Sequence, residues 1–131
     1  MDQAWDGRCN CGAVRIAARG APLRAGLCHC LTCQRETGGP CMAFAVWRAE
    51  AVTVEGETRE WGENAYRRRF CAACGSRVTG ASAEDGETEV RLGVFEGGGR
   101  GLVPEYELWV IRRQGWMAPV PGARQYERER E

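Results

Sequence analysis

The sequence contains no lysine and only one histidine, His29, and these two scarcities exclude several kinds of catalyst. The absence of lysine excludes a Schiff-base lysine as the catalyst. A serine, histidine and aspartate set is also excluded, because the single histidine lies inside a cluster of cysteines. Catalysis by this chain would have to use other groups.

Long apolar runs and a net charge are lacking as well. No segment approaches the roughly 20 apolar residues of a membrane span, and the start MDQAWDGRCN lacks the basic and apolar parts of a secretion signal. The 18 basic and 18 acidic residues give a formal net charge of zero, so no long-range field attracts nucleic acid or an anionic membrane. We therefore expect a cytoplasmic protein with neither partner.

Cysteine, in contrast, is abundant, with eight residues in 131. Disulfides are rare in a reducing compartment, and the cysteines cluster as Cys-x-Cys, Cys-x-Cys-x-x-Cys and Cys-x-x-Cys. This clustering favours metal binding over cross-linking. The length suits one domain over residues 1–131, in which we expect 118–131 to be a frayed tail.

The densest cluster holds Cys28, Cys30 and Cys33. If a helical turn begins at Leu31, Cys30 and Cys33 share a face and Cys28 reaches them from the preceding strand. Zinc suits thiolates, and three protein ligands with one open position are typical of a catalytic site. Cys41 is the complication, since it either closes the tetrahedron or is a small residue that starts an apolar strand.

Two further pairs, Cys9 with Cys11 and Cys71 with Cys74, make a four-cysteine set despite a separation of about sixty residues. Four thiolates are the closed composition of a structural zinc site. The alternative is four free thiols buried as small apolar residues. His29 is expected to point away from its cysteine neighbours, with at most a supporting role.

The pattern of apolar residues predicts a mostly β protein. We expect the strands 13–18 and 23–27 to form a hairpin, and Met42 to Trp47 to be a central strand covered on both faces. Residues 88–95 should form a strand with Val90, Leu92 and Val94 on one face and Arg91 on the other. Further strands are expected over 52–54, around Trp61, over 65–70 and over 105–111.

An open zinc held by thiolates would bind an incoming thiol, lower its pKa and hold it beside an electrophile. Arg35 and the triplet Arg67 to Arg69 could pair with substrate carboxylates, although arginines on strand faces usually face water. Glu36 is as readily a solvated residue of a helical turn. Trp47, Trp109 and Trp116 are expected in the core or in a pocket wall.

Three segments, GRCNCGAVRI, CHCLTCQRETGG and FCAACGS, and more loosely PEYELWV, resemble the glutathione-dependent formaldehyde-activating enzymes and the related domain of centromere protein V. The resemblance implies a tent-like fold of small antiparallel sheets, a structural zinc on Cys9, Cys11, Cys71 and Cys74, and a catalytic zinc on Cys28, Cys30 and Cys33. It also implies a carbon–sulfur lyase that joins glutathione and formaldehyde into S-hydroxymethylglutathione, or acts on a related small thiol. Arg35 and Gly38 would then help to seat the peptide.

Two other classes of function stay open. The chain could be a non-catalytic, zinc-stabilised module that binds another protein, which the absence of a recognisable acid–base pair favours. Nucleic-acid binding through Arg67 to Arg69 is a third possibility, against which the zero net charge argues.

Overall fold

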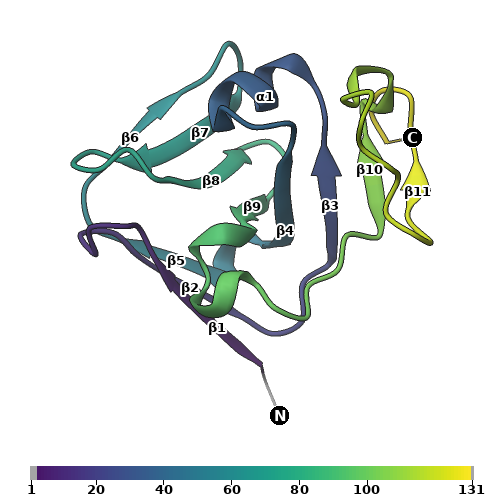
Figure 1. Ribbon diagram of the computed structural model, residues 1–131. Coiled ribbons are helices and arrows are strands. Elements are labelled where there is room, and N and C mark those ends of the chain that lie inside the picture. The colour runs from purple at the N-terminus through teal and green to yellow at the C-terminus, as the bar shows by residue number, and fades with distance from the viewer. Residues whose placement is uncertain (1–2, 131) are drawn as a thin grey trace.

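Two β-sheets and one α-helix make up residues 3–130, the part of the chain that the computed structural model describes (Figure 1). A three-stranded sheet has the order β1–β2–β5, formed by Ala4–Arg8, Arg15–Arg19 and Val52–Glu55. An eight-stranded sheet has the order β11–β10–β3–β4–β9–β8–β7–β6. Its strands, in chain order, are β3 (Arg24–Cys28), β4 (Met42–Arg48), β6 (Thr58–Trp61), β7 (Tyr66–Cys71), β8 (Arg77–Ser82), β9 (Glu87–Arg91), β10 (Tyr106–Leu108) and β11 (Arg124–Gln125).

The helix α1 spans Leu31–Thr37 and follows β3 directly. The predicted mostly β, single-domain architecture is confirmed. No helix within residues 3–130 combines the length and the apolar character that crossing a membrane requires.

Strand β4 lies at the centre of the fold and is covered on both faces, as its continuous apolar run predicted. Ala45 and Trp47 belong to an apolar cluster that includes residues of the three-stranded sheet. Phe44 and Val46 belong to a second cluster, which contains Cys28, Cys33 and the residues of β10. A single strand therefore contributes to the cores on both sides of the larger sheet.

The predicted hairpin between residues 13–18 and 23–27 is wrong. Strand β2 pairs with β1 and β5, whereas β3 pairs with β4 and β10. The turn after β2 carries the chain from one sheet to the other, and Trp47 fixes this crossing with a 2.9 Å hydrogen bond from its indole nitrogen to the carbonyl of Gly20. The partners of β2 are instead β1, which precedes it, and β5, which follows β4 in the chain.

Two predicted strands are shorter than expected. Strand β9 ends at Arg91, and a 3₁₀ turn over Leu92–Val94 brings Phe95 against Trp47, with ring centroids 5.6 Å apart. Strand β10 ends at Leu108, because Trp109 adopts a left-handed conformation with φ of 57° and a 3₁₀ turn follows. Apolar alternation continues through both turns, so it does not reveal where pairing stops.

The C-terminal segment is not frayed where the structure describes it. Strand β11 adds to β10 in parallel, and the carboxylate of Glu107, 1% exposed, holds the segment from within the sheet. It accepts hydrogen bonds from the Val120 amide at 2.7 Å and the Gln125 side chain at 2.9 Å, and it lies 3.3 Å from the Arg113 guanidinium. The Nε2 of His29, a fully buried residue, lies 2.7 Å from Oε1 of the carboxylate, the same oxygen that Arg113 approaches, whereas Val120 and Gln125 donate to Oε2. The C-terminal segment is therefore held largely by polar contacts with one buried carboxylate.

These contacts make Glu107 a pH-dependent source of stability. Burial opposes ionisation, but the hydrogen bonds from Gln125, Val120 and His29 outweigh it and lower the pKa of the carboxyl to about 2. A depressed pKa stabilises the fold above the ordinary pKa of about 4.5 and loses that effect as the pH falls towards 2. We expect Glu107→Gln to lower the free energy of unfolding by about 3 kcal/mol at pH 7 and by much less near pH 3.

Denaturant unfolding at the two pH values measures this difference, with Glu127→Gln at an exposed position of the same segment as the control. A Glu107→Gln effect that is equally large at both pH values would contradict the assignment.

Candidate metal centres and adjoining cavities

Four cysteines from distant parts of the chain meet at one end of the structure. Cys9 and Cys11 lie in the turn between β1 and β2, while Cys71 ends β7 and Cys74 lies in the following turn. Their sulfurs all lie within 4.8 Å of one another. The Cys9 and Cys11 sulfurs are 3.6 Å apart, and those of Cys11 and Cys71 are 3.8 Å apart. Four sulfurs around a tetrahedral ion at about 2.3 Å would be separated by about 3.8 Å, so the group could hold a metal ion.

Backbone amides surround these thiols, as expected of sulfurs that carry negative charge. The Val14 amide donates to the sulfur of Cys9 at 3.2 Å, and the amides of Ala73 and Cys74 donate to that of Cys71 at 3.3 and 3.4 Å. Hydrogen bonds from Ser76 lower the pKa of the Cys74 thiol to about 5. These donors stabilise the thiolate form, which is the form that binds a metal, at Cys9, Cys71 and Cys74. At Cys11 the Ala13 amide favours the thiolate, but the contacts with Cys9 and the other sulfurs outweigh it and raise the pKa of the thiol to about 11.

Three further cysteines form the second group. Cys28 is the last residue of β3, Cys30 is the N-cap of α1, and Cys33 lies in its first turn. Their sulfurs are also mutually within 4.8 Å. The Cys33 amide donates to the Cys30 sulfur at 3.3 Å. Hydrogen bonds from Cys28 and Cys33 lower the pKa of the Cys30 thiol, and the same contacts raise the pKa of the Cys28 thiol, so the three sulfurs share one negative charge most readily at Cys30. This group could hold a metal ion through three thiolates.

A cavity of about 620 Å³ opens beside the three thiols, all of which line it. Its other walls include Phe44, Trp109 and Tyr66. Cys41 does not belong to the group of sulfurs and instead precedes β4, half-buried, where burial raises the pKa of its thiol. The described geometry thus leaves the fourth side of the three-thiol group facing a cavity rather than a fourth cysteine.

A buried cluster of charges holds α1 onto the larger sheet. Both oxygens of the Glu36 carboxylate accept from Arg91 of β9, at 3.2 and 3.1 Å, and one of them also accepts from Arg68 of β7. The Arg68 guanidinium also lies 3.6 Å from the Cys33 sulfur. The side chains of Glu36 and Arg91 are each only 6% exposed, so the alternative of a solvated Glu36 is wrong.

The cluster extends through Tyr66, whose hydroxyl accepts from Arg91 at 3.2 Å and donates to Glu89 at 2.5 Å. Sequence reasoning missed Arg91 and Tyr66. Alternation placed Arg91 on the solvent face of its strand, and the only signal of burial would have been the acid on a helix fifty-five residues earlier.

Removing the central carboxylate would leave Arg68 without a carboxylate partner and Arg91, 6% exposed, with only Glu89 at 3.5 Å. We expect Glu36→Gln to lower the free energy of unfolding by about 3 kcal/mol, because breaking a buried pair exposes the desolvation cost of the remaining charge. Thermal or denaturant unfolding measures it. The matched control is Glu60→Gln, a carboxylate 45% exposed that pairs with Arg67 and Arg69 and should cost less than about 1 kcal/mol. Equal losses for the two variants would contradict this account.

The other residues named in the sequence analysis lie in different parts of the structure. Arg35 lines a second cavity of about 420 Å³, whereas Gly38 lines neither cavity and ends α1 in a left-handed conformation with φ of 68°. Arg67 and Arg69 pair with Glu60 near the surface. Trp47 is buried and Trp109 lines the larger cavity, but Trp116 is 74% exposed, so its predicted burial is wrong. His29 contacts Glu107 and stays outside both sulfur groups, as expected.

The fold and these two groups define a small β protein with a closed set of four thiols and an open set of three, each able to hold a metal ion. The sequence model of the glutathione-dependent formaldehyde-activating enzyme family matches residues 4–112. The chain therefore belongs to that family, as its cysteine segments suggested.

Individual relatives are distant. An uncharacterized lyase of Schizosaccharomyces pombe is 27% identical over 75 residues, which are 56% of this chain and 55% of the yeast protein. The chain thus aligns with only about half the length of that relative. A crystal structure of a Rhodobacter sphaeroides protein has a TM-score of 0.55 and 24% identity, over 74% of this chain and 89% of that one. This likeness concerns the fold alone.

Proposed function

We propose that the protein is a zinc enzyme that joins a small thiol to an aldehyde, with glutathione and formaldehyde as the leading pair. The observation that carries the proposal is the cavity beside Cys28, Cys30 and Cys33, which gives an external thiol access to the open side of three thiolates. Membership of the family supports glutathione and formaldehyde as substrates. The name of the yeast relative, a lyase, is consistent with carbon–sulfur chemistry.

Zinc suits both sulfur groups because it accepts thiolates in a tetrahedron. Cys9, Cys11, Cys71 and Cys74 would hold a structural ion that joins the turn after β1 to the turn after β7. Cys28, Cys30 and Cys33 would hold the second ion. When bound there, zinc lowers the pKa of a thiol that joins it and orients the thiolate.

The chain's own residues would surround the thiol and the aldehyde during the addition. The substrate sulfur attacks the carbonyl carbon to form the carbon–sulfur bond, and the proton that the thiol gave up ends on the former carbonyl oxygen, so that thiol and aldehyde yield a hemithioacetal. Arg68 holds the Cys33 sulfur in place, and the apolar side chains of Phe44 and Trp109 border the reaction space and limit water.

The metal content distinguishes the two proposed sites. Protein purified without chelator under reducing conditions should contain two zinc ions per chain. We expect Cys74→Ala to lose one ion and much of its thermal stability, because a structural zinc contributes on the order of 10 kcal/mol to folding. Cys30→Ala should lose the other ion with a smaller stability change. Cys41→Ala is the matched control and should retain both, whereas loss of an ion in that variant would mean that the second site is closed.

The activity follows from an open site. The wild type and Cys41→Ala should accelerate the condensation of glutathione with formaldehyde, as measured by exchange spectroscopy at equilibrium. The reaction should return to the uncatalysed rate with Cys30→Ala. Two bound zinc ions without acceleration would favour the alternative of a zinc-stabilised module that binds another protein.

A further inference from the structure

The guanidinium of Arg68 reaches both the three-thiol group and the space in which a thiol would react. Its Nη1 donates to the Glu36 carboxylate and lies 3.6 Å from the Cys33 sulfur. The same side chain, 13% exposed, lines the larger cavity beside the thiols and the smaller one beside α1. Arg68 therefore places a positive charge at the point where these cavities and the sulfurs meet.

This guanidinium is held in position without a ligand. Besides Glu36 and Cys33, it contacts the Tyr66 ring, whose centroid lies 5.0 Å from the guanidinium carbon. Gly80 on the neighbouring strand leaves room for that ring, because a Cβ at this position would lie 2.0 Å from the Tyr66 hydroxyl. A donor fixed in advance stabilises a developing charge without first having to reorient.

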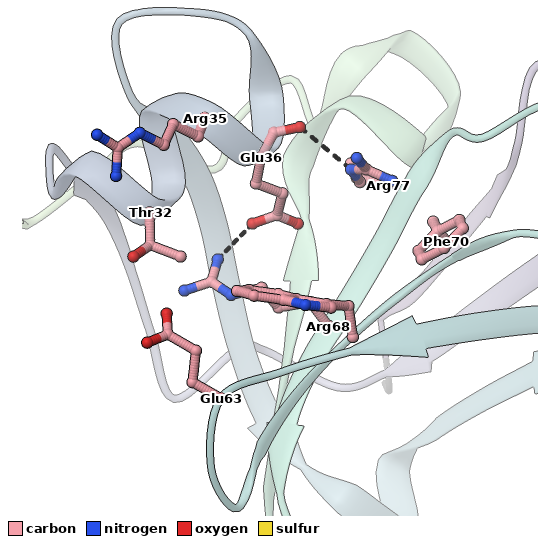
Figure 2. A pocket seen from close by; sticks show the side chains of 8 residues that line it. Thr32, Arg35, Glu36, Glu63, Arg68, Phe70 and Arg77 are labelled. Carbon is pink, nitrogen blue, oxygen red and sulfur yellow. Dashed lines mark hydrogen bonds and ion pairs between the residues drawn. The ribbon is translucent and has the colours of Figure 1, made fainter.

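Part of the guanidinium has no protein partner. Within residues 3–130, neither Nε nor Nη2 of Arg68 donates to a protein acceptor, and Glu63, which lines both cavities, forms no ion pair with it. Figure 2 shows one nitrogen of Arg68 joined to Glu36 and a second directed away from Glu36, on the side of Glu63. Since a guanidinium carries five N–H donors in one plane, some remain for a ligand.

The charge of Arg68 is also permanent. Burial opposes it, but the contacts with Cys33 and Glu36 outweigh burial and raise the pKa of the guanidinium. The group can thus donate hydrogen bonds but does not act as an acid. Such donors are suited to a carbonyl oxygen, which gains negative charge when a thiolate attacks its carbon.

We propose that Arg68 is a catalytic residue that donates from Nη2 to the carbonyl oxygen of the aldehyde while Nη1 stays on Glu36 and Cys33. The proposal rests on the proposed function, in which the substrate sulfur lies at the three thiolates. As the sulfur–carbon bond forms, one electron pair of the carbonyl double bond moves to the oxygen, where Arg68 stabilises the negative charge. Water then gives this oxygen a proton, which balances the proton that the thiol released to solvent, and the guanidinium is unchanged.

Arg68→Lys separates this role from the support of Cys33. Lysine keeps the positive charge, but its single ammonium would be held by Glu36, so no donor is left for the aldehyde. We expect kcat for the condensation of glutathione with formaldehyde to fall about a hundredfold, the effect of one lost oxyanion donor. The zinc content and the dissociation constant for 2-mercaptoethanol should stay those of the wild type. The matched control is Arg67→Lys, on the same strand but lining neither cavity, which should keep its kcat.

A binding measurement tests the same donor without turnover. Mercaptoacetate has a negatively charged oxygen close to its sulfur, whereas 2-mercaptoethanol has a neutral hydroxyl there. Titration calorimetry on the zinc-loaded protein gives the ratio of their dissociation constants. The preference for mercaptoacetate should fall about tenfold in Arg68→Lys, the effect of one lost charged hydrogen bond, and stay unchanged in Arg67→Lys.

An unchanged kcat in Arg68→Lys, an equal fall in Arg67→Lys, or an unchanged ratio of dissociation constants in Arg68→Lys would overturn the proposal. A fall in kcat that accompanies the loss of a zinc ion would overturn it too, because Arg68 would then act only through the Cys33 sulfur. The proposed function fails separately if the wild type does not accelerate the condensation. In that case the ratio of dissociation constants still tests whether Arg68 donates to an oxygen beside a bound sulfur.

Discussion

The position of α1 depends on the carboxylate of Glu36, because its two oxygens are the counter-charge for arginines that come from two different strands. Arg91 and Arg68 each approach this carboxylate, and Arg68 continues to the sulfur of Cys33. The helix has only seven residues and would not be stable alone. Since α1 contains Cys33, is capped by Cys30 and lines both cavities, this charge contributes directly to the geometry of the region.

The two sulfur groups differ in how the chain assembles them. The four-thiol group joins turns about sixty residues apart, so it exists only when both sheets have formed, and a metal bound there would link them. The three-thiol group belongs to six consecutive residues at a junction of strand and helix. Its local origin leaves one side without protein, and this side faces the larger cavity. A closed and an open group therefore arise from long-range and short-range contacts respectively.

Much of this arrangement could be predicted from the sequence, and the predictions that were wrong or missing have physical reasons. Cysteine spacing identified which thiols meet, because few other side chains produce such clusters, and a continuous apolar run identified β4 as a strand covered on both faces. The hairpin of β2 and β3 was wrong because neighbours in sequence were assumed to be partners. The burial of Arg91 could not be predicted, since its partner Glu36 lies on an element whose position depends on tertiary contacts.

The hydrogen bonds to the buried Glu107 carboxylate show how far the folded region extends along the chain. The family match stops at residue 112, yet three of the groups that solvate the buried carboxylate, those of Arg113, Val120 and Gln125, lie beyond it. A shortened protein cut at the family boundary would keep the negative charge in the sheet and lose most of its hydrogen-bond donors. The stretch after residue 112 thus supplies the hydrogen-bond donors that water would supply to an exposed carboxylate. The folding unit is therefore longer than the region by which the family is recognised.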